Sequence, residues 1–157
     1  MTDTKRQWPA TRIARALLLG YLLALALLVL WPGEDHAGGG VVMFFARIIA
    51  GWGAPLQATF LTLEFLANIV LFVPFGLLVP LAIGSVRAGT LWLTVLAGFA
   101  LTVVIEWVQG LFEGRVSDPR DVVANSLGTV LGVLLLVLFT SRRRASIERR
   151  VRTPDAH

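Results

Sequence analysis

Four long runs of apolar residues leave this 157-residue chain few ways to fold. They cover residues 13–31, 62–83, 90–112 and 122–140. A run of about 19–23 residues, at 1.5 Å per residue in a helix, spans the ~30 Å hydrocarbon core of a bilayer. Strands of a membrane barrel would be about ten residues long and would alternate in polarity. Because lipid offers no partner for unpaired backbone groups, the runs predict an all-α integral membrane protein, a four-helix bundle.

The composition excludes an ordinary soluble domain. Hydrophobic residues make up 56% of the chain and charged residues 15%, whereas soluble domains hold about 25% charged residues. Cysteine is absent, which excludes a disulfide framework, a thiolate metal site and a cysteine nucleophile. The length suits one membrane domain, residues 13–140, between a basic amino-terminal segment (1–12) and a basic tail (141–157). No cofactor is expected.

Lys and Arg residues are distributed unevenly among the segments that connect the apolar runs. The amino-terminal segment and the start of the first run carry four, the tail carries six, and the second connection carries Arg87. These eleven lie on one side of the predicted bundle, and three lie on the other: Arg47, Arg115 and Arg120. Because positive charge is retained on the cytoplasmic side, both termini are predicted to be cytoplasmic, in a plasma membrane of the bacterial type.

The basic ends predict contact with lipid rather than with nucleic acid. The tail holds six arginines against two acidic residues directly after an apolar run. Such clusters set orientation and meet anionic headgroups. We expect the tail to continue the last helix briefly and then to be disordered.

The first apolar run has one alternative, a cleaved signal peptide with a basic start. Its apolar body exceeds the usual length of about 7–15 residues. The sequence that follows, WPGEDHAGGG, offers no small-x-small cleavage site. We therefore expect a membrane span.

Residues 41–60 form a second ambiguous segment. They are apolar but interrupted by Trp52, Gly53 and Pro55. This pattern favours an interfacial or re-entrant helix between the first two spans. A fifth span is the alternative, and the equal charge count at its two ends weighs against it.

Each of the last three runs carries a polar pair at helical spacing, where lipid makes polar groups costly. The pairs are Glu64 and Asn68, Glu106 and Gln109, and Asp121 and Asn125. Residues three or four apart share a helix face. The pairs begin the second run, end the third and begin the fourth, so all three are predicted to lie at one level, on the outer side. Thr102 continues the third face by one turn.

The connection EGRVSDPRD adds charged residues at the same level. Asp118 directly before Pro119 has the pattern of a helix N-cap with proline in the first helical position. The charged residues of this connection are Glu113, Arg115, Asp118, Arg120 and Asp121. Together with the pairs they predict a polar cluster just inside the extracytoplasmic surface.

Proline and glycine mark where the helices are expected to bend and to contact each other. Pro74 and Pro80 each remove a backbone donor inside the second run and predict a bend. Gly128-x-x-x-Gly132 continues the polar face of the fourth run and predicts close approach to another helix.

Three interpretations of the polar cluster stay open. It can be a mutually satisfied network that joins the helices. It can be a binding site for a headgroup, a glycan or a peptide. A catalytic interpretation has weaker support, because both histidines, His36 and His157, lie outside the spans. It would rest on Glu106, Asp118 and Asp121 as an acid–base pair or as ligands of a hard cation, at separations that the sequence leaves open.

The order and spacing of these residues resemble the VanZ-like membrane proteins. NIVLFVPFG, from Asn68 through Pro74 to Gly76, is similar to the first signature of that family. The second signature is similar to the following residues: Glu106, Gln109, Gly114, Arg115, Asp118, Arg120, Asp121, Asn125 and Gly128. The resemblance covers about residues 12–139. It implies that these polar residues form one set, with Pro74, Gly76, Gly128 and Gly132 in helix packing.

What the resemblance implies about function is limited. The founding member of the family is associated with low-level resistance to teicoplanin, a glycopeptide directed at the cell wall. We therefore expect a non-enzymatic protein of the cell envelope that binds a lipid headgroup, a cell-wall precursor or a glycopeptide. The alternatives are a membrane enzyme with a lipid-linked substrate and a structural or assembly partner that docks through Gly128 and Gly132, in a homo-oligomer for example. A transporter has the least support, since no internal repeat is visible.

Overall fold

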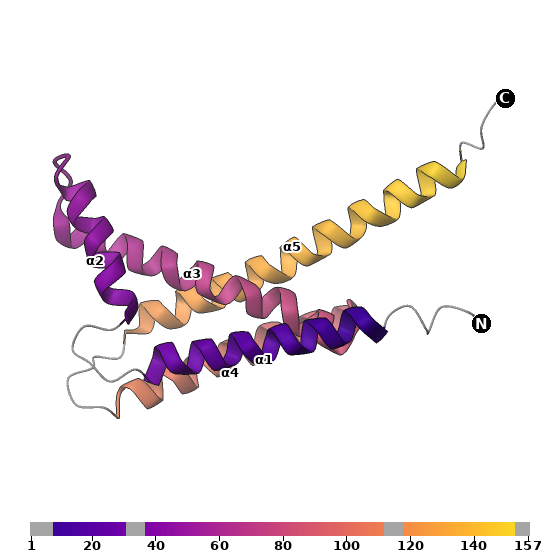
Figure 1. Cartoon of the computed structure of the whole chain (residues 1–157), viewed down its shortest axis with the longest axis horizontal. Helices are drawn as coiled ribbons and strands as arrows, with labels where there is room; N and C mark the ends of the chain where they lie inside the picture. The colour runs from indigo at the N-terminus through magenta and orange to yellow at the C-terminus, as the bar shows by residue number, and fades with distance from the viewer. Residues whose placement is uncertain (1–7, 31–36, 112–117, 153–157) are drawn as a thin grey trace.

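The protein is an assembly of five α-helices in the computed structural model, which describes residues 8–30, 37–111 and 118–152. The helices are α1 (Trp8–Leu30), α2 (Ala37–Ala50), α3 (Leu56–Ile83), α4 (Ala88–Gln109) and α5 (Pro119–Arg152) (Figure 1). The described residues contain no strand. The predicted all-α class is confirmed.

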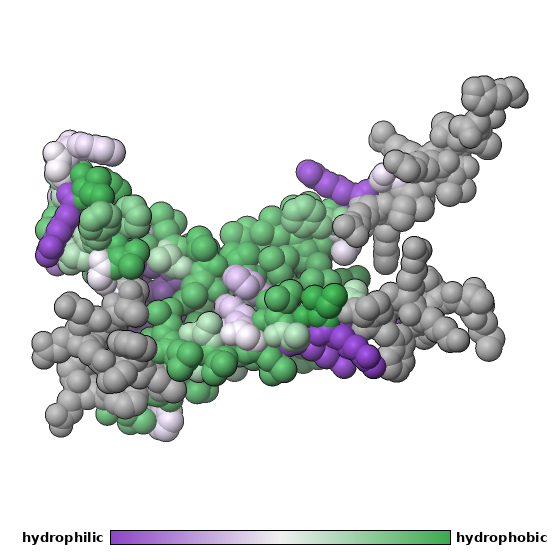
Figure 2. Space-filling model, in the orientation of Figure 1, coloured by the Kyte–Doolittle hydropathy of each residue, from purple (hydrophilic) through white to green (hydrophobic). Residues whose placement is uncertain are grey.

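Four of the helices are long and apolar enough to cross a membrane. These spans are Ala10–Leu28, Leu56–Ile83, Ala88–Gln109 and Pro119–Arg142, close to the four predicted runs. Large apolar side chains cover their outer faces, and Leu19, Trp92 and Val70 are each 69% exposed. Figure 2 shows the hydrophobic surface along the middle of the molecule and hydrophilic residues toward its ends. Because lipid is as apolar as these side chains, the exposed faces match a bilayer, and the chain is a multi-pass membrane protein.

The four spans alternate in direction. Helix α1 begins and α5 ends at the same end of the molecule, where α3 also turns into α4 (Figure 1). An even number of alternating spans brings the start of the first and the end of the last to the same end of the bundle. Helix α5 continues past the predicted end at residue 140 to Arg152, which is longer than the short continuation expected for the tail.

Helix α2 lies beside the first half of α3 (Figure 1). Its 14 residues make a helix about 21 Å long, which is shorter than the ~30 Å core of a bilayer. The turn that joins α2 to α3 includes Gly53 at φ 99°, a left-handed conformation that favours glycine. The extra helix predicted between the first two spans is confirmed, and its length argues against a fifth span.

Glycines allow α3 and α5 to cross at close range. A Cβ atom on Gly128 would meet the carbonyl oxygen of Ile69, and one on Gly132 would meet that of Val73. From the other side, a Cβ on Gly76 would meet the carbonyl oxygen of Thr129. Since these obstacles are backbone atoms, no side chain can move aside. Gly128 and Gly132, which were predicted to approach another helix, lie where α5 meets α3.

Helix α1 is held to α3 by two polar contacts. The Tyr21 hydroxyl donates to the carbonyl oxygen of Leu71 at 3.0 Å. Leu71 lies three residues before Pro74, where a proline disturbs the hydrogen bonds of the preceding turn. Nε of Arg15 donates to the carbonyl oxygen of Ala82 at 2.9 Å, in the last turn of α3, where carbonyl groups lack helical partners. The first span therefore does more than anchor the chain.

Candidate functional site

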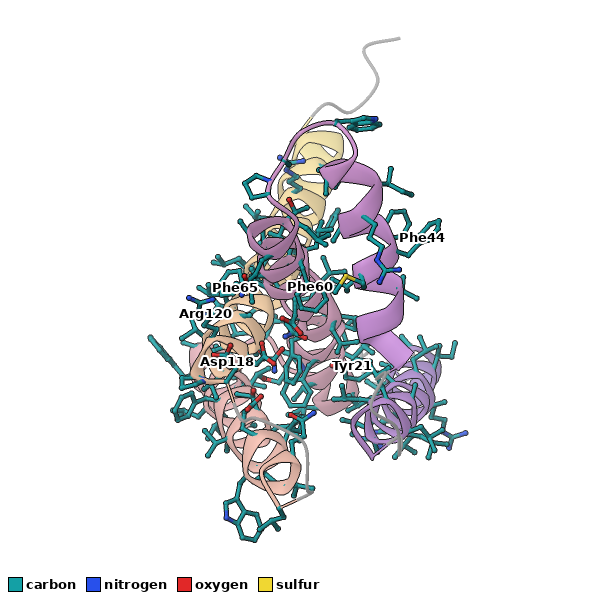
Figure 3. The ribbon with its side chains drawn as sticks, turned by 90° about the vertical axis from the view of Figure 1, so that its left-hand side faces the viewer. Tyr21, Phe44, Phe60, Phe65, Asp118 and Arg120 are labelled. Atoms are coloured by element: carbon teal, nitrogen blue, oxygen red, sulfur yellow. The ribbon has the colours of Figure 1, made fainter. Side chains whose placement is uncertain are left out.

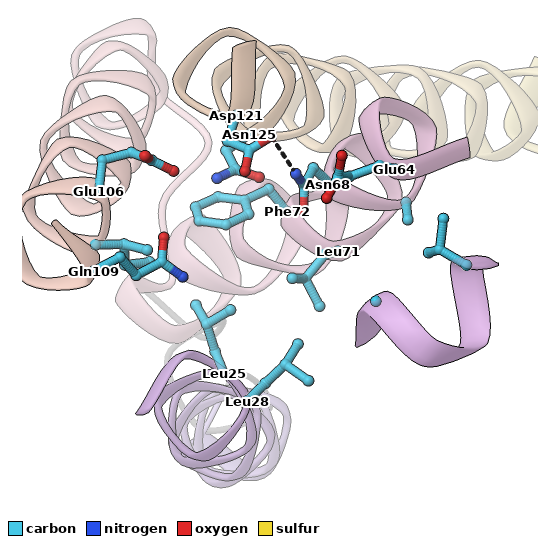
Figure 4. A pocket seen from close by; sticks show the side chains of 14 residues that line it. Leu25, Leu28, Glu64, Asn68, Leu71, Phe72, Glu106, Gln109, Asp121 and Asn125 are labelled. Carbon is cyan, nitrogen blue, oxygen red and sulfur yellow. Dashed lines mark hydrogen bonds between the residues drawn. The ribbon is translucent and has the colours of Figure 1, made fainter. Parts of the chain in front are cut away.

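A cavity of about 220 Å³ lies where all five helices meet, at the end of the bundle opposite the start of α1. Its walls combine polar side chains from α3, α4 and α5 with apolar side chains from every helix except α5 (Figure 4). The lining residues are Leu25, Leu28, Gly39, Val42, Glu64, Ala67, Asn68, Leu71, Phe72, Ile105, Glu106, Gln109, Asp121 and Asn125.

The three predicted polar pairs all line this one cavity. Helix α3 contributes Glu64 and Asn68 from its first half, α4 contributes the pair in its last turn, and α5 contributes the pair in its first two turns (Figure 4). The prediction that the pairs lie at one level is confirmed. The three carboxylates and three amides are Glu64, Glu106, Asp121, Asn68, Gln109 and Asn125.

Asn68 and Asp121 join α3 to α5 across the cavity wall. Nδ2 of Asn68 donates to Oδ1 of Asp121 at 2.7 Å (Figure 4). A carboxylate accepts at about four lone-pair positions, so this bond leaves Asp121 with capacity for further donors. Both residues are half-buried. Asp121 is thus held in place and can still accept a hydrogen bond from a ligand.

Asn125 forms the innermost polar contact. Its Nδ2 donates to Oγ1 of Thr102 at 2.8 Å, in a bond that joins α5 to α4. Thr102 is fully buried and Asn125 is 4% exposed. Oδ1 of Asn125 is buried and has no hydrogen-bond partner among the described residues. A buried acceptor without a donor costs about 1–3 kcal/mol, so a ligand that donates a hydrogen bond to this atom would remove that cost.

Glu106 ties α4 to the start of α5. One of its carboxylate oxygens, Oε2, accepts a hydrogen bond of 3.0 Å from the backbone N–H of Asp118. Oδ1 of Asp118 in turn accepts from the backbone N–H of Arg120 at 2.9 Å, which caps α5 at Pro119. The predicted N-cap is confirmed. Glu106 is only 6% exposed, and its contact holds Asp118 at the start of α5.

The remaining charged residues of the predicted cluster differ in their positions. Asp118 and Arg120 lie at the start of α5, where Figure 3 labels them, and neither lines the cavity. The Arg120 side chain is exposed. Glu113 and Arg115 lie outside the described residues, so their predicted membership of the site stays a prediction.

The apolar part of the cavity was not predicted. Leu25 and Leu28 come from α1, and Val42 comes from α2. Phe72 lies one turn beyond Asn68 and is 1% exposed. Because Phe72 is four residues after Asn68, helical spacing could have placed it on the same face and so in the cavity wall. Leucines in an apolar run carry no signal that separates a cavity wall from a lipid-facing surface.

The polar side chains that line the cavity favour ligands that donate hydrogen bonds. Every lining carboxylate and amide offers oxygen acceptors, and in the part of the chain that the structure describes none of the lining residues is Lys or Arg. Among residues 8–30, 37–111 and 118–152, no group of three His, Asp or Glu side chains is arranged to hold a metal ion. The cavity is thus a polar recess with apolar walls between the helices of the bundle.

Fold and site together define a small multi-pass helical membrane protein with a polar cavity between its spans. The sequence model of the VanZ/LLP1 family matches residues 18–140, from α1 into α5. The chain belongs to the VanZ/LLP1 family, and the predicted resemblance is confirmed. Searches of the curated proteins and of the solved structures found no significant match.

Proposed function

We propose that this VanZ/LLP1 protein binds the polar headgroup of an amphiphile of the cell envelope in its cavity. The ligand is a membrane lipid or a lipid-linked cell-wall precursor. The observation that carries the proposal is the combination of three carboxylates and three amides with apolar walls in one recess between spans. A ligand that is polar at one end and apolar at the other suits such walls.

The size of the cavity supports a headgroup over a whole glycopeptide. Sites for drug-sized ligands have volumes of roughly 300–1,000 Å³, whereas this cavity has about 220 Å³. A glycopeptide would need a much larger surface. The link between the family and glycopeptide resistance therefore suggests an indirect effect in this chain, through the lipids or precursors of the envelope.

The distribution of Lys and Arg supports the location of the site. With both termini in the cytoplasm, as eleven basic residues on one side indicate, the cavity opens in the outer half of the plasma membrane. Headgroups of the outer leaflet and exported lipid-linked precursors are present at that level.

The experiment compares Glu106→Gln and Asp121→Asn with the wild type in a host that lacks the chromosomal gene. Gln57→Glu is the control, since Gln57 is exposed and does not line the cavity. We expect both cavity variants to reach normal membrane abundance and to lose tolerance of teicoplanin or of envelope stress, whereas the control keeps it. Full tolerance in both cavity variants at normal abundance would refute the proposed function.

A further inference from the structure

An apolar groove adjoins the polar cavity. It lies between α1 and α4, has a volume of about 170 Å³ and is almost entirely apolar. Leu25 and Ile105 line both the groove and the cavity, so the two spaces meet at these residues. The groove lies within the membrane spans Ala10–Leu28 and Ala88–Gln109. Its walls include Leu22, Leu25, Leu101, Val104, Ile105 and Val108.

We propose that the cavity and the groove together bind one membrane lipid whose headgroup ends in a primary ammonium. The ammonium lies among the cavity oxygens and one acyl chain lies in the groove between α1 and α4. This inference rests on the proposed function and names its ligand class.

Oδ1 of Asn125, which has no hydrogen-bond partner in residues 8–30, 37–111 and 118–152, is the first reason for an ammonium. This oxygen is buried in a side chain that is 4% exposed and that lines the cavity, and it needs a donor. Figure 4 shows Asn125 beside Asp121, next to the side chain of Asn68. A primary ammonium has three N–H donors and no acceptor, so it can donate to this oxygen and to a carboxylate of the cavity.

Charge complementarity is the second reason. Among the described residues, three carboxylates line the cavity and none of the lining residues is Lys or Arg. An ammonium is attracted by such a site, and a headgroup with a net negative charge is repelled by it. A quaternary ammonium carries the same charge but has no N–H donor. Hydrogen bonds, together with the added volume of three methyl groups, would therefore distinguish an ethanolamine headgroup from a choline headgroup.

The groove accounts for the rest of the ligand. Helices α1 and α4 make few contacts with each other, whereas each of them packs more closely against α3. This leaves a slot between α1 and α4. Within a bilayer, lipid acyl chains are the apolar groups available to fill such a groove. Because the groove meets the cavity at Leu25 and Ile105, a chain in the groove places its own headgroup at the polar residues.

The test is native mass spectrometry of the purified full chain in mild detergent, with dioleoyl lipids added at equal concentration. The headgroup series runs from phosphatidylethanolamine through its N-methyl and N,N-dimethyl forms to phosphatidylcholine. We expect retention to fall with each added methyl group, by about tenfold from the first lipid to the last. Each methyl group replaces one N–H donor to a charged acceptor. Equal retention of the first and last lipid would overturn the inference.

Three variants locate the lipid. Asp121→Asn keeps the shape and the acceptor for Asn68 but removes the charge, so the preference for phosphatidylethanolamine should fall about tenfold. Val104→Trp fills the groove and should weaken retention of every lipid in the series. Val103→Trp is its control, since Val103 is the neighbouring exposed residue and does not line the groove. Equal retention by the two tryptophan variants would overturn the groove assignment.

Failure of the inference differs from failure of the proposed function. If phosphatidylglycerol or a lipid-linked sugar binds in a way that depends on Asp121, without preference for the ammonium, the inference is wrong and the proposed function stands. If no lipid binds in a way that depends on Asp121, both are wrong.

Discussion

Nδ2 of Asn68 lies 2.7 Å from Oδ1 of Asp121, so one hydrogen bond links the polar faces of α3 and α5 at the wall of the cavity. The same two helices cross closely further along, where glycines remove the side chains between them. The bond therefore sets the position of a carboxylate within a crossing that is already rigid. Its energetic coupling is measurable apart from any ligand.

A double-mutant cycle measures this coupling. Asn68→Ala, Asp121→Ala and the double variant should show a coupling free energy of about 0.5–2 kcal/mol in reversible unfolding from detergent micelles. Thr62→Ala is the control partner for Asp121→Ala, because the Thr62 hydroxyl donates to Ala58 of its own helix. That control pair should be additive. Additivity for Asn68 and Asp121 as well would show that the bond does not form.

The buried bond between Asn125 and Thr102 predicts an unequal response of two threonines on α4. Thr102→Val keeps the volume and removes the acceptor of the Asn125 Nδ2 group, which should lower the unfolding free energy by about 1–3 kcal/mol. Thr94 is equally buried at 1% exposure, but its hydroxyl donates to Thr90 of its own helix. Thr94→Val should therefore cost less than about 1 kcal/mol. Equal losses would contradict the interhelical role of Thr102.

The glycines of α5 predict a sharp contrast with a glycine of α1. Gly128→Ala places a Cβ against the carbonyl oxygen of Ile69 and should lower the unfolding free energy by about 1–3 kcal/mol or more. Gly20→Ala is the matched change in an open position, since a Cβ there meets nothing within 4 Å. Because alanine favours helix by about 1 kcal/mol, this variant should be neutral or stabilised. A neutral Gly128→Ala would contradict the close crossing.

The proposed orientation has a direct test, because the chain contains no cysteine. Gln57→Cys and Ser141→Cys place single thiols at exposed positions near opposite ends of the bundle. A membrane-impermeant maleimide added to intact cells should label the first variant and leave the second unlabelled until the cells are opened. The reverse pattern would place the termini outside.

The spans and the level of the polar pairs were predictable from particular residues. Lipid penalises polar groups strongly, so each pair in an apolar run carries information. Helical spacing placed Glu64 with Asn68 and Asp121 with Asn125 on single faces, and the order of the runs put all of them at one end of the bundle. The cap at Asp118 followed from the proline after it.

The apolar half of the site was not predictable, because lipid-facing and cavity-facing leucines look alike in a sequence. Leu25 lines the cavity and is 4% exposed, whereas Leu27 is 59% exposed on the same helix. The contact of α1 with α3 depends on the carbonyl group of Leu71, and a backbone acceptor has no sequence signature. The pairing of Thr102 with Asn125 was not predictable either, because it depends on the relative depth of α4 and α5 in the bundle.

The most direct test of the central claim, that the cavity holds an amphiphile of the envelope, is photo-crosslinking in living cells. A genetically encoded diazirine amino acid replaces Leu28 in the cavity wall, or Leu27 on the exposed face as the control. Mass spectrometry of the purified chain should find one discrete lipid class attached at position 28, lost on Asp121→Asn, and a mixture of bulk lipids at position 27 that Asp121→Asn leaves unchanged. The same mixture at both positions, unaffected by Asp121→Asn, would contradict a binding site in the cavity.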